Sequence, residues 1–194
     1  MIRQIPLLRT VLLGVLLLHL SGCATSAQQH SESEELYRQA VNILESVPLI
    51  DGHNDIPWQY HTRVGHRLTA IDLMDTSAEN PPIHTDLQRL REGHVGGQFW
   101  SAYVPASIPE SEAVQQTLEQ IDFIHRMVQA WPDHLQLALT AHGIEQAFER
   151  GRIASLIGLE GGHSIGNSLA VLRQLYRLGA RYMTLTHSRT LDWA

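Results

Sequence analysis

Short apolar runs alternate with amphipathic segments along most of the chain. Runs bounded by glycine, proline or polar residues predict β-strands over 47–50, 95–104, 135–140, 152–160 and 180–187. Apolar side chains recur every three or four residues in three longer segments, which predicts helices over 36–47, 111–131 and 167–179. Shorter helices are predicted over 85–93 and 143–151. Because most of the strands are continuously apolar, we expect a parallel α/β sheet that is covered on both faces.

Two architectures agree with this alternation of strands and helices. One is an open, doubly wound sheet, and the other is a (β/α)8 barrel of the TIM type. No glycine-rich dinucleotide fingerprint follows the first strand, where the sequence reads DGHND. The periodicity alone leaves both open. A complete barrel takes roughly 250 residues, so a barrel built from this chain is expected to stop after about five strands.

The amino-terminal segment has the pattern of a bacterial lipoprotein signal. Arg3 and Arg9 precede an apolar core of about ten residues, which is shorter than the roughly twenty that span a bilayer. The segment ends in LSGC, which resembles a lipobox, so we predict a signal peptide over 1–22 and lipidation of Cys23. An ordinary cleaved signal with an incidental cysteine is the alternative. Residues 23–34 are polar and predict a tether. By resemblance to the sorting rules of enterobacterial lipoproteins, Ala24 after the cysteine favours a lipid-anchored protein at the periplasmic face of the outer membrane.

Composition narrows the function classes. The chain is 43% hydrophobic and 18% charged, which is ordinary for a globular protein, and its formal net charge of -6 argues against a nucleic-acid partner. Cys23 is the only cysteine, which excludes an internal disulfide framework. The unusual count is 12 histidines, a residue that frequently binds metals or transfers protons.

Polar residues end three of the predicted strands. His53 and Asp55 end the first, Glu160 ends the fourth and His187 ends the fifth. Parallel strands bring their carboxyl ends to one edge, so these side chains are expected to converge. Imidazole and carboxylate ligands suit Zn²⁺. Taken singly, His53 could be an ordinary polar residue, Asp55 or Asp51 could cap a turn, and Glu160 could form a structural ion pair.

Three stretches resemble the membrane dipeptidase (renal dipeptidase) family of zinc peptidases. They are PLIDGHNDIPWQ, LREGHVGGQFWSAYVP and LEGGHSIGNSLAVLRQLYRLGARYMTLTH, and the resemblance runs from about Pro48 to Ala194. It implies that residues 35–194 are the amino-terminal part of a (β/α)8 metal-dependent hydrolase barrel. The expected reaction is hydrolysis of dipeptides through a metal-bound hydroxide, with two zinc ions as cofactors. A homodimer is a candidate assembly.

The same resemblance implies roles for four residues. His53 and Asp55 match ligands of one zinc ion, and Glu160 matches the catalytic carboxylate that bridges both ions. His187 matches a histidine that binds the substrate. The family also has further ligands of the second ion, an arginine, and an aspartate late in its sequence. None of these residues has a counterpart in these 194 residues. We therefore expect that these residues alone are poorly folded and are not an active dipeptidase.

Two other functions stay open at this point. The chain could be a non-catalytic remnant or a binding protein that keeps part of the site. It could also belong to another class of two-metal amidohydrolase that acts on cyclic amides. The spacing of Tyr176 and Tyr182 and the EGGHS segment favour the dipeptidase over the latter.

Overall fold

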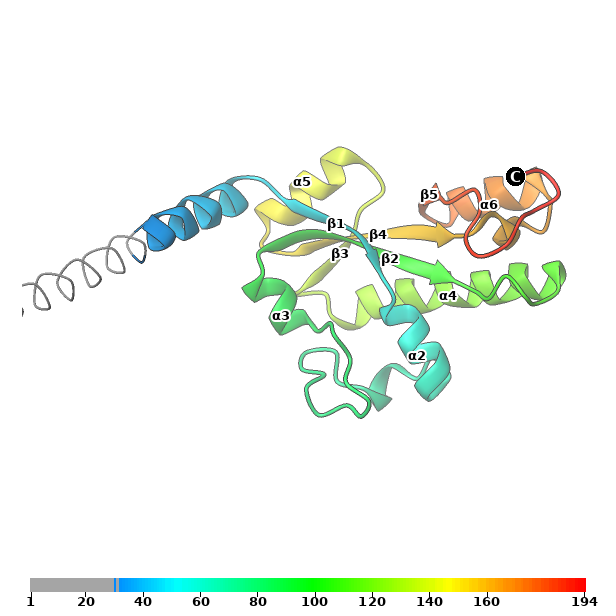
Figure 1. Ribbon diagram of the computed structural model, residues 1–194, viewed down its shortest axis with the longest axis horizontal. Coiled ribbons are helices and arrows are strands. Elements are labelled where there is room, and N and C mark those ends of the chain that lie inside the picture. The colour runs from blue at the N-terminus through cyan, green and yellow to red at the C-terminus, as the bar shows by residue number, and fades with distance from the viewer. Residues whose placement is uncertain (1–29, 31) are drawn as a thin grey trace, which may run out of the picture. The chain divides into compact units, whose positions relative to one another are not determined.

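Figure 1 shows the computed structural model of the chain, which describes residue 30 and residues 32–194. The described residues divide into two units, one up to Ile43 and one from Leu44 to Ala194. A helix covers residues 32–46, so it includes the last three positions that the sequence assigned to the tether. In the described part of the chain, no helix is both long and apolar enough to cross a membrane. The predicted signal peptide and Cys23 lie outside the described residues.

Five parallel strands form one sheet, which confirms the predicted sheet type. They are β1 (Leu49–Asn54), β2 (Val95–Tyr103), β3 (Leu135–Leu137), β4 (Ile153–Glu160) and β5 (Ala180–Met183). β2 pairs with β4 along one edge, whereas β3 and β5 share the other edge, beside residues 153–155 and 157–159. The short β3 therefore does not separate β2 from β4. The sheet is therefore at most four strands wide at any level: β1, β2, β4 and either β3 or β5.

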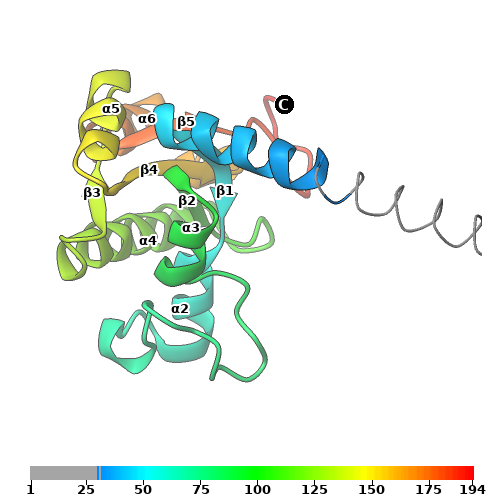
Figure 2. The ribbon, with the colours of Figure 1, turned by 90° about the vertical axis from the view of Figure 1, so that its left-hand side faces the viewer.

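Helices cover both faces of this sheet, and Figures 1 and 2 show this arrangement from two directions. On one face, α4 (Glu110–Ala130) contributes Phe123 and Met127 to a core cluster that includes Trp100 and Ile157. On the other face, α5 (Ala141–Glu149) contributes to a smaller cluster with Ala154 and Leu156 of β4. Side chains alternate along a strand. The Glu160 side chain therefore lies on the same face of the sheet as α5, but at the carboxyl end of β4, beyond Ala154 and Leu156.

Two of the helices show how a polar side chain caps the first turn. α3 (Leu87–Glu92) follows Asp86, whose carboxylate accepts a hydrogen bond from the Arg89 backbone N–H. α6 (Leu169–Arg177) follows Ser168, whose hydroxyl accepts from the Val171 backbone N–H. Each side chain satisfies a backbone donor that has no partner within the first turn. Two short 3₁₀ turns, η1 (Leu68–Ala70) and η2 (Gly162–Ile165), complete the described elements.

One helix was not predicted. α2 (Ile56–Val64) begins directly after β1, with Pro57 in its first turn, and ends at Gly65, which has a φ of 57°. Proline is tolerated in the first turn because its missing N–H would have no partner there. Glycine takes the left-handed conformation that closes the helix. α2 follows β1 so closely that it fixes the residues at the end of that strand.

The first strand differs from its prediction. The sequence placed a buried strand over 47–50, but β1 runs later, from Leu49 to Asn54, and is exposed from Leu49 to His53. Its apolar residues Leu49 and Ile50 are 41% and 39% exposed. The physical reason is position, because β1 lies at the edge of the sheet and pairs only with β2 among the described strands. Its apolar side chains therefore have a neighbour on one side only.

Candidate metal centre

His53 and Asp55 lie at the junction between β1 and α2. His53 is in the strand, and Asp55 occupies the position before the first residue of the helix. The Asp55 carboxylate makes no capping hydrogen bond, so the alternative that Asp55 caps a turn is wrong. Asp51 does cap a turn, because its carboxylate accepts a hydrogen bond from the His53 backbone N–H at 3.1 Å. The Asp55 Oδ1 atom instead lies 3.1 Å from His53 Nε2.

Glu160 ends β4 and has the least exposed side chain of the candidate residues, at 13%. Its Oε2 atom accepts a hydrogen bond from the Ser101 hydroxyl at 2.8 Å and lies 3.4 Å from His53 Nε2. Its Oε1 atom lies 3.3 Å from His187 Nδ1. Each carboxylate oxygen of Glu160 therefore has a histidine nitrogen beside it.

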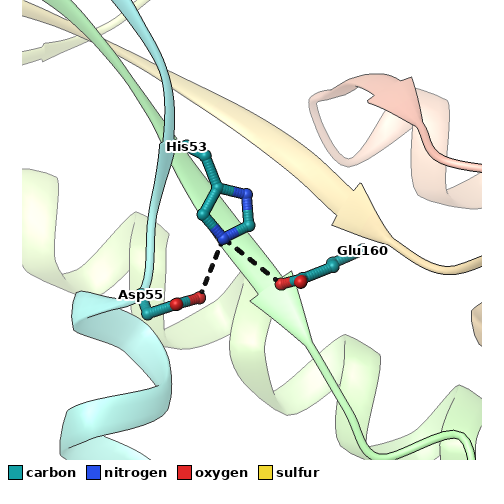
Figure 3. Close-up of side chains that lie close together, drawn as sticks. All are labelled: His53, Asp55 and Glu160. Carbon is teal, nitrogen blue, oxygen red and sulfur yellow. Dashed lines mark hydrogen bonds and ion pairs between the residues drawn. The ribbon is translucent and has the colours of Figure 1, made fainter. Parts of the chain in front are cut away.

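His53, Asp55 and Glu160, which we call the metal-centre cluster, each offer a donor atom within 4.8 Å of the others. Figure 3 shows the imidazole lying between the two carboxylates, with Glu160 approaching from a different strand. Within the described residues, neither Asp55 nor Glu160 pairs with an arginine; their charged-group partners are histidines. Two carboxylates without a fixed cation attract a positive ion, and one nitrogen with carboxylate oxygens is a suitable donor set for zinc.

His187 lies in a loop and not at a strand end. The sequence expected the fifth strand to run over 180–187, but β5 stops at Met183, four positions earlier. The His187 side chain is 41% exposed, and its ring lies edge-on to Tyr103 at 5.7 Å between centroids. The loop still brings His187 to Glu160, so the predicted convergence of the four polar residues is observed.

The glycines after Glu160 allow the chain to turn sharply beside the site. Gly161 has a φ of 111°, and a side chain on it would collide with the His163 ring. His163 is buried, and its Nε2 atom lies 2.9 Å from the Val104 carbonyl oxygen, which follows β2. This contact ties the turn after β4 to the end of β2, so it fixes the direction in which Glu160 leaves the strand.

Two polar residues of the site were missed by the sequence analysis. Ser101 lies two positions before Tyr103, the residue of β2 that pairs with Glu160, so it shares the site face. Tyr182 lies on β5, and its hydroxyl donates to the Gly52 carbonyl at 3.0 Å. A serine within the apolar run QFWSAYV was the available signal for the first. No local signal marks the second, because its partner is 130 positions away.

The surroundings of Tyr182 show the negative character of this face. Burial raises the pKa of the Tyr182 phenol, and the carboxylates of Glu160, Asp55 and Asp51 raise it further. All three act in the same direction because a phenolate would add a like charge beside them. The phenol therefore keeps its proton and acts as a hydrogen-bond donor.

A cavity of about 450 Å³ opens beside the cluster. His53 and Asp55 line it together with Gln59, Arg63 and His84. A larger cavity of about 680 Å³ lies elsewhere, at the amino ends of the strands, and contains none of the cluster residues. The size of the cavities and the chemistry of their lining residues therefore favour different cavities as the substrate site. The smaller cavity is the better candidate for a substrate, because it reaches the only group of metal-ligand type found among the described residues.

Comparison with known proteins gives a consistent picture. The sequence model of the family "Membrane dipeptidase (Peptidase family M19)" matches residues 37–194. Dipeptidase ataJ of Aspergillus terreus is 46% identical over 159 residues, covering 78% of this chain and 38% of its own length. Dipeptidase 3 of Rattus norvegicus is 44% identical, covering 82% of this chain and 31% of its own length. The chain thus spans less than half of the curated relatives that it matches.

Solved structures agree on the fold. A metallopeptidase named dipeptidase AC superposes with a TM-score of 0.64 at 25% identity, over 74% of this chain and 44% of that one. A Rhodobacter sphaeroides metallopeptidase, crystallised with a phosphinate mimic of the dipeptide L-Ala-D-Ala, has the same TM-score at 23% identity, over 74% and 46%. The sheet is therefore part of a TIM-type barrel, and the open doubly wound alternative is excluded.

Proposed function

This chain belongs to the membrane dipeptidase family, and we propose that it supplies part of a zinc-dependent dipeptidase site. The observation that carries the proposal is the metal-centre cluster at the carboxyl ends of the strands. Ligands and catalytic residues collect at this end of TIM-type barrels. The family is one of metallopeptidases, and the three side chains offer the nitrogen and oxygen donors that zinc accepts.

The geometry supports a distinct role for each residue. His53 and Asp55 are proposed to bind one ion. Glu160 presents its two oxygens to opposite neighbours, His53 and His187, which suits a carboxylate that bridges two ions. Zinc, when bound, lowers the pKa of a coordinated water and polarises the scissile carbonyl. Ser101 holds the orientation of Glu160, and the exposed His187 is placed to donate a hydrogen bond to the substrate.

Dipeptides are the proposed substrate class. The curated relatives are named dipeptidases, and one solved relative holds a mimic of L-Ala-D-Ala. We therefore include dipeptides with a D-residue at the carboxyl position. The remaining ligands of a second zinc ion are proposed to come from outside the described residues, in which the cluster is the only group of this kind.

The experiment separates metal binding from turnover. The 194-residue chain alone is expected to bind zinc but to hydrolyse no dipeptide at an enzymatic rate. A chimera is then made in which residues 37–194 replace the matching part of dipeptidase ataJ, and it is assayed on L-Ala-L-Ala and L-Ala-D-Ala. We expect zinc-dependent turnover that is lost in Glu160→Gln. The matched control Glu149→Gln changes an exposed glutamate of α5 in the same way and should keep turnover.

Each alternative function gives a different result. A chain and chimera that bind no zinc at the cluster would contradict the site assignment. A chimera that binds zinc and hydrolyses neither dipeptide supports the binding protein or remnant. Hydrolysis of a cyclic amide such as dihydrouracil, without dipeptide turnover, supports the amidohydrolase.

The lipid anchor is a separate proposal, which rests on the LSGC segment. We propose that Cys23 is acylated and holds the protein at the periplasmic face of the outer membrane. Stable attachment takes more than one acyl chain, since a single chain binds only marginally. Cells labelled with a fatty-acid analogue should transfer label to the wild-type protein and not to Cys23→Ser. Equal labelling of the two would refute the anchor. The homodimer stays a prediction.

A further inference from the structure

The Tyr182 side chain joins two strands that are not neighbours in the sheet. Tyr182 lies on β5, and its hydroxyl donates to the carbonyl of Gly52 on β1 at 3.0 Å. β4 and β2 lie between these strands in the pairing order. Neighbouring strands are about 4.8 Å apart, so a flat sheet would separate β1 from β5 by about 14 Å, farther than one side chain reaches. The bond therefore forms across the concave side of a curled sheet, on the face that carries Glu160.

Gly158 makes room for this arrangement. It lies on β4, two positions before Glu160, and pairs with Tyr182. A methyl group added at Gly158 would overlap the Tyr182 ring near its hydroxyl. The Phe99 ring of β2 contacts the same Tyr182 ring, at 4.9 Å between centroids. The ring thus crosses over the central strands, and only a glycine at position 158 allows it to reach β1.

Another side-chain bond to the backbone beside Gly52 is longer: Gln98 Nε2 of β2 donates to the Asp51 carbonyl at 3.4 Å. β1 pairs along one edge only, and its register with β2 is interrupted between Asp51 and Asn54, where Gly52 and His53 lie. The side chains from Leu49 to His53 are exposed. The bond from Tyr182 to Gly52 therefore acts on the backbone directly before the metal-centre histidine.

We propose that Tyr182 is a positioning residue, which holds β1 at Gly52 and thereby keeps His53 Nε2 within reach of Glu160. The proposal rests on the proposed function, because it concerns the residues that would bind zinc there. Mutation of a residue that orients a metal ligand without touching the ion typically weakens metal binding by about 10- to 100-fold. A purely structural bond would change stability without this effect.

The test compares two tyrosines that make the same kind of bond. Tyr182→Phe removes the hydroxyl that donates to Gly52. Tyr60→Phe removes a buried hydroxyl that donates to the Ile71 carbonyl at 2.9 Å, a bond in which no cluster residue takes part. Each variant is made in the ataJ chimera described above, zinc dissociation constants are measured by competition with a chelator, and stability is measured by denaturant unfolding. We expect zinc binding to weaken roughly tenfold in Tyr182→Phe. Tyr60→Phe should lose stability and keep the wild-type zinc affinity.

A second variant acts on the same bond by another route. Gly158→Ala keeps the hydroxyl but displaces the ring, so it should weaken zinc binding as Tyr182→Phe does, and the double variant should add little further loss. Wild-type affinity in Tyr182→Phe, in a chimera that binds zinc, would overturn the positioning role and leave the metal centre standing. An otherwise unchanged chimera that binds no zinc would instead overturn the metal centre itself.

Discussion

Strand β4 is buried from Ile153 to Leu159, whereas β1 is exposed from Leu49 to His53. β4 has paired strands on both edges, and its backbone register with β2 is unbroken over its length. β1 has one paired edge and an interrupted register. Both strands nevertheless carry residues of the proposed metal centre to the same place.

The difference shows that two kinds of force place the ligands. The hydrophobic core fixes β4, so the position of Glu160 follows from packing that also holds the whole domain together. His53 depends more on polar contacts of β1, which include the Asp51 turn, the side chain of Asn54, the bond from Gln98 to the Asp51 carbonyl and the bond from Tyr182. Changes to β4 should therefore affect stability first, and changes around β1 should affect the metal site with a smaller effect on stability.

The largest expected effect is on the free energy of unfolding, from one isoleucine on each strand. Ile157→Ala on β4 removes a fully buried side chain and should cost about 2–5 kcal/mol. Ile50→Ala on β1 removes a side chain that is 39% exposed and should cost about 1 kcal/mol or less. Denaturant unfolding of both variants measures the contrast. Equal losses would show that β1 is as well packed as β4.

A second effect concerns the segment beside β1, which Asp86 holds together. The carboxylate of Asp86 caps α3, pairs with the Arg89 guanidinium at 2.8 Å and accepts from the Thr76 backbone N–H. The segment includes Thr85, whose hydroxyl accepts from the Asn54 side chain of β1. Asp86→Asn should lower the free energy of unfolding by about 2 kcal/mol, since it removes the ionic partner of Arg89.

The same residue gives a pH test. Burial raises the pKa of Asp86, but hydrogen bonds from Arg89 and Thr76 outweigh it, so the pKa lies below its ordinary value. A lowered pKa in the folded state contributes stability that is present above the unfolded pKa of about 3.9 and is lost as the pH falls through the folded value. Acid unfolding of the wild type should therefore be steeper than that of Asp86→Asn. Parallel acid curves would contradict this.

The smallest effect tests the orientation of Glu160. Ser101→Ala removes the hydroxyl that donates to Oε2 at 2.8 Å and should weaken zinc binding roughly tenfold, or about 1.4 kcal/mol. Ser155→Ala is the matched control, because Ser155 is buried on β4 and its hydroxyl has no hydrogen-bond partner among the described residues. If both variants bind zinc like the wild type, the Ser101 bond has no part in the metal centre.

The sequence predicted the part of the fold that depends on local pattern. β4 is an apolar run with one serine, Ser155, and it ends in Glu160, so both its burial and its terminal carboxylate could be expected. The predicted strand over 47–50 is also apolar, but the edge position of β1 is a property of the sheet and not of the run, so its burial was predicted wrongly. α2 was missed because its proline and its aromatic residues are poor signals of a helix.

The site follows the same division. The convergence of His53, Asp55, Glu160 and His187 was expected from strand ends that share one edge, and the structure brings the four side chains together. The supports Ser101 and Tyr182 meet partners 59 and 130 positions away, on strands whose order and curvature were not known. Such contacts depend on which strands pair and how the sheet curls, and no local pattern encodes either.

The most direct test is anomalous diffraction at the zinc absorption edge from crystals of the protein grown with zinc. We expect an anomalous peak about 2.0–2.2 Å from His53 Nε2 and from carboxylate oxygens of Asp55 and Glu160. The peak should vanish or weaken strongly in Glu160→Gln. A structure in which zinc occupies other histidines, for example the neighbouring His61 and His66 rings, and leaves the cluster without a peak would contradict the account.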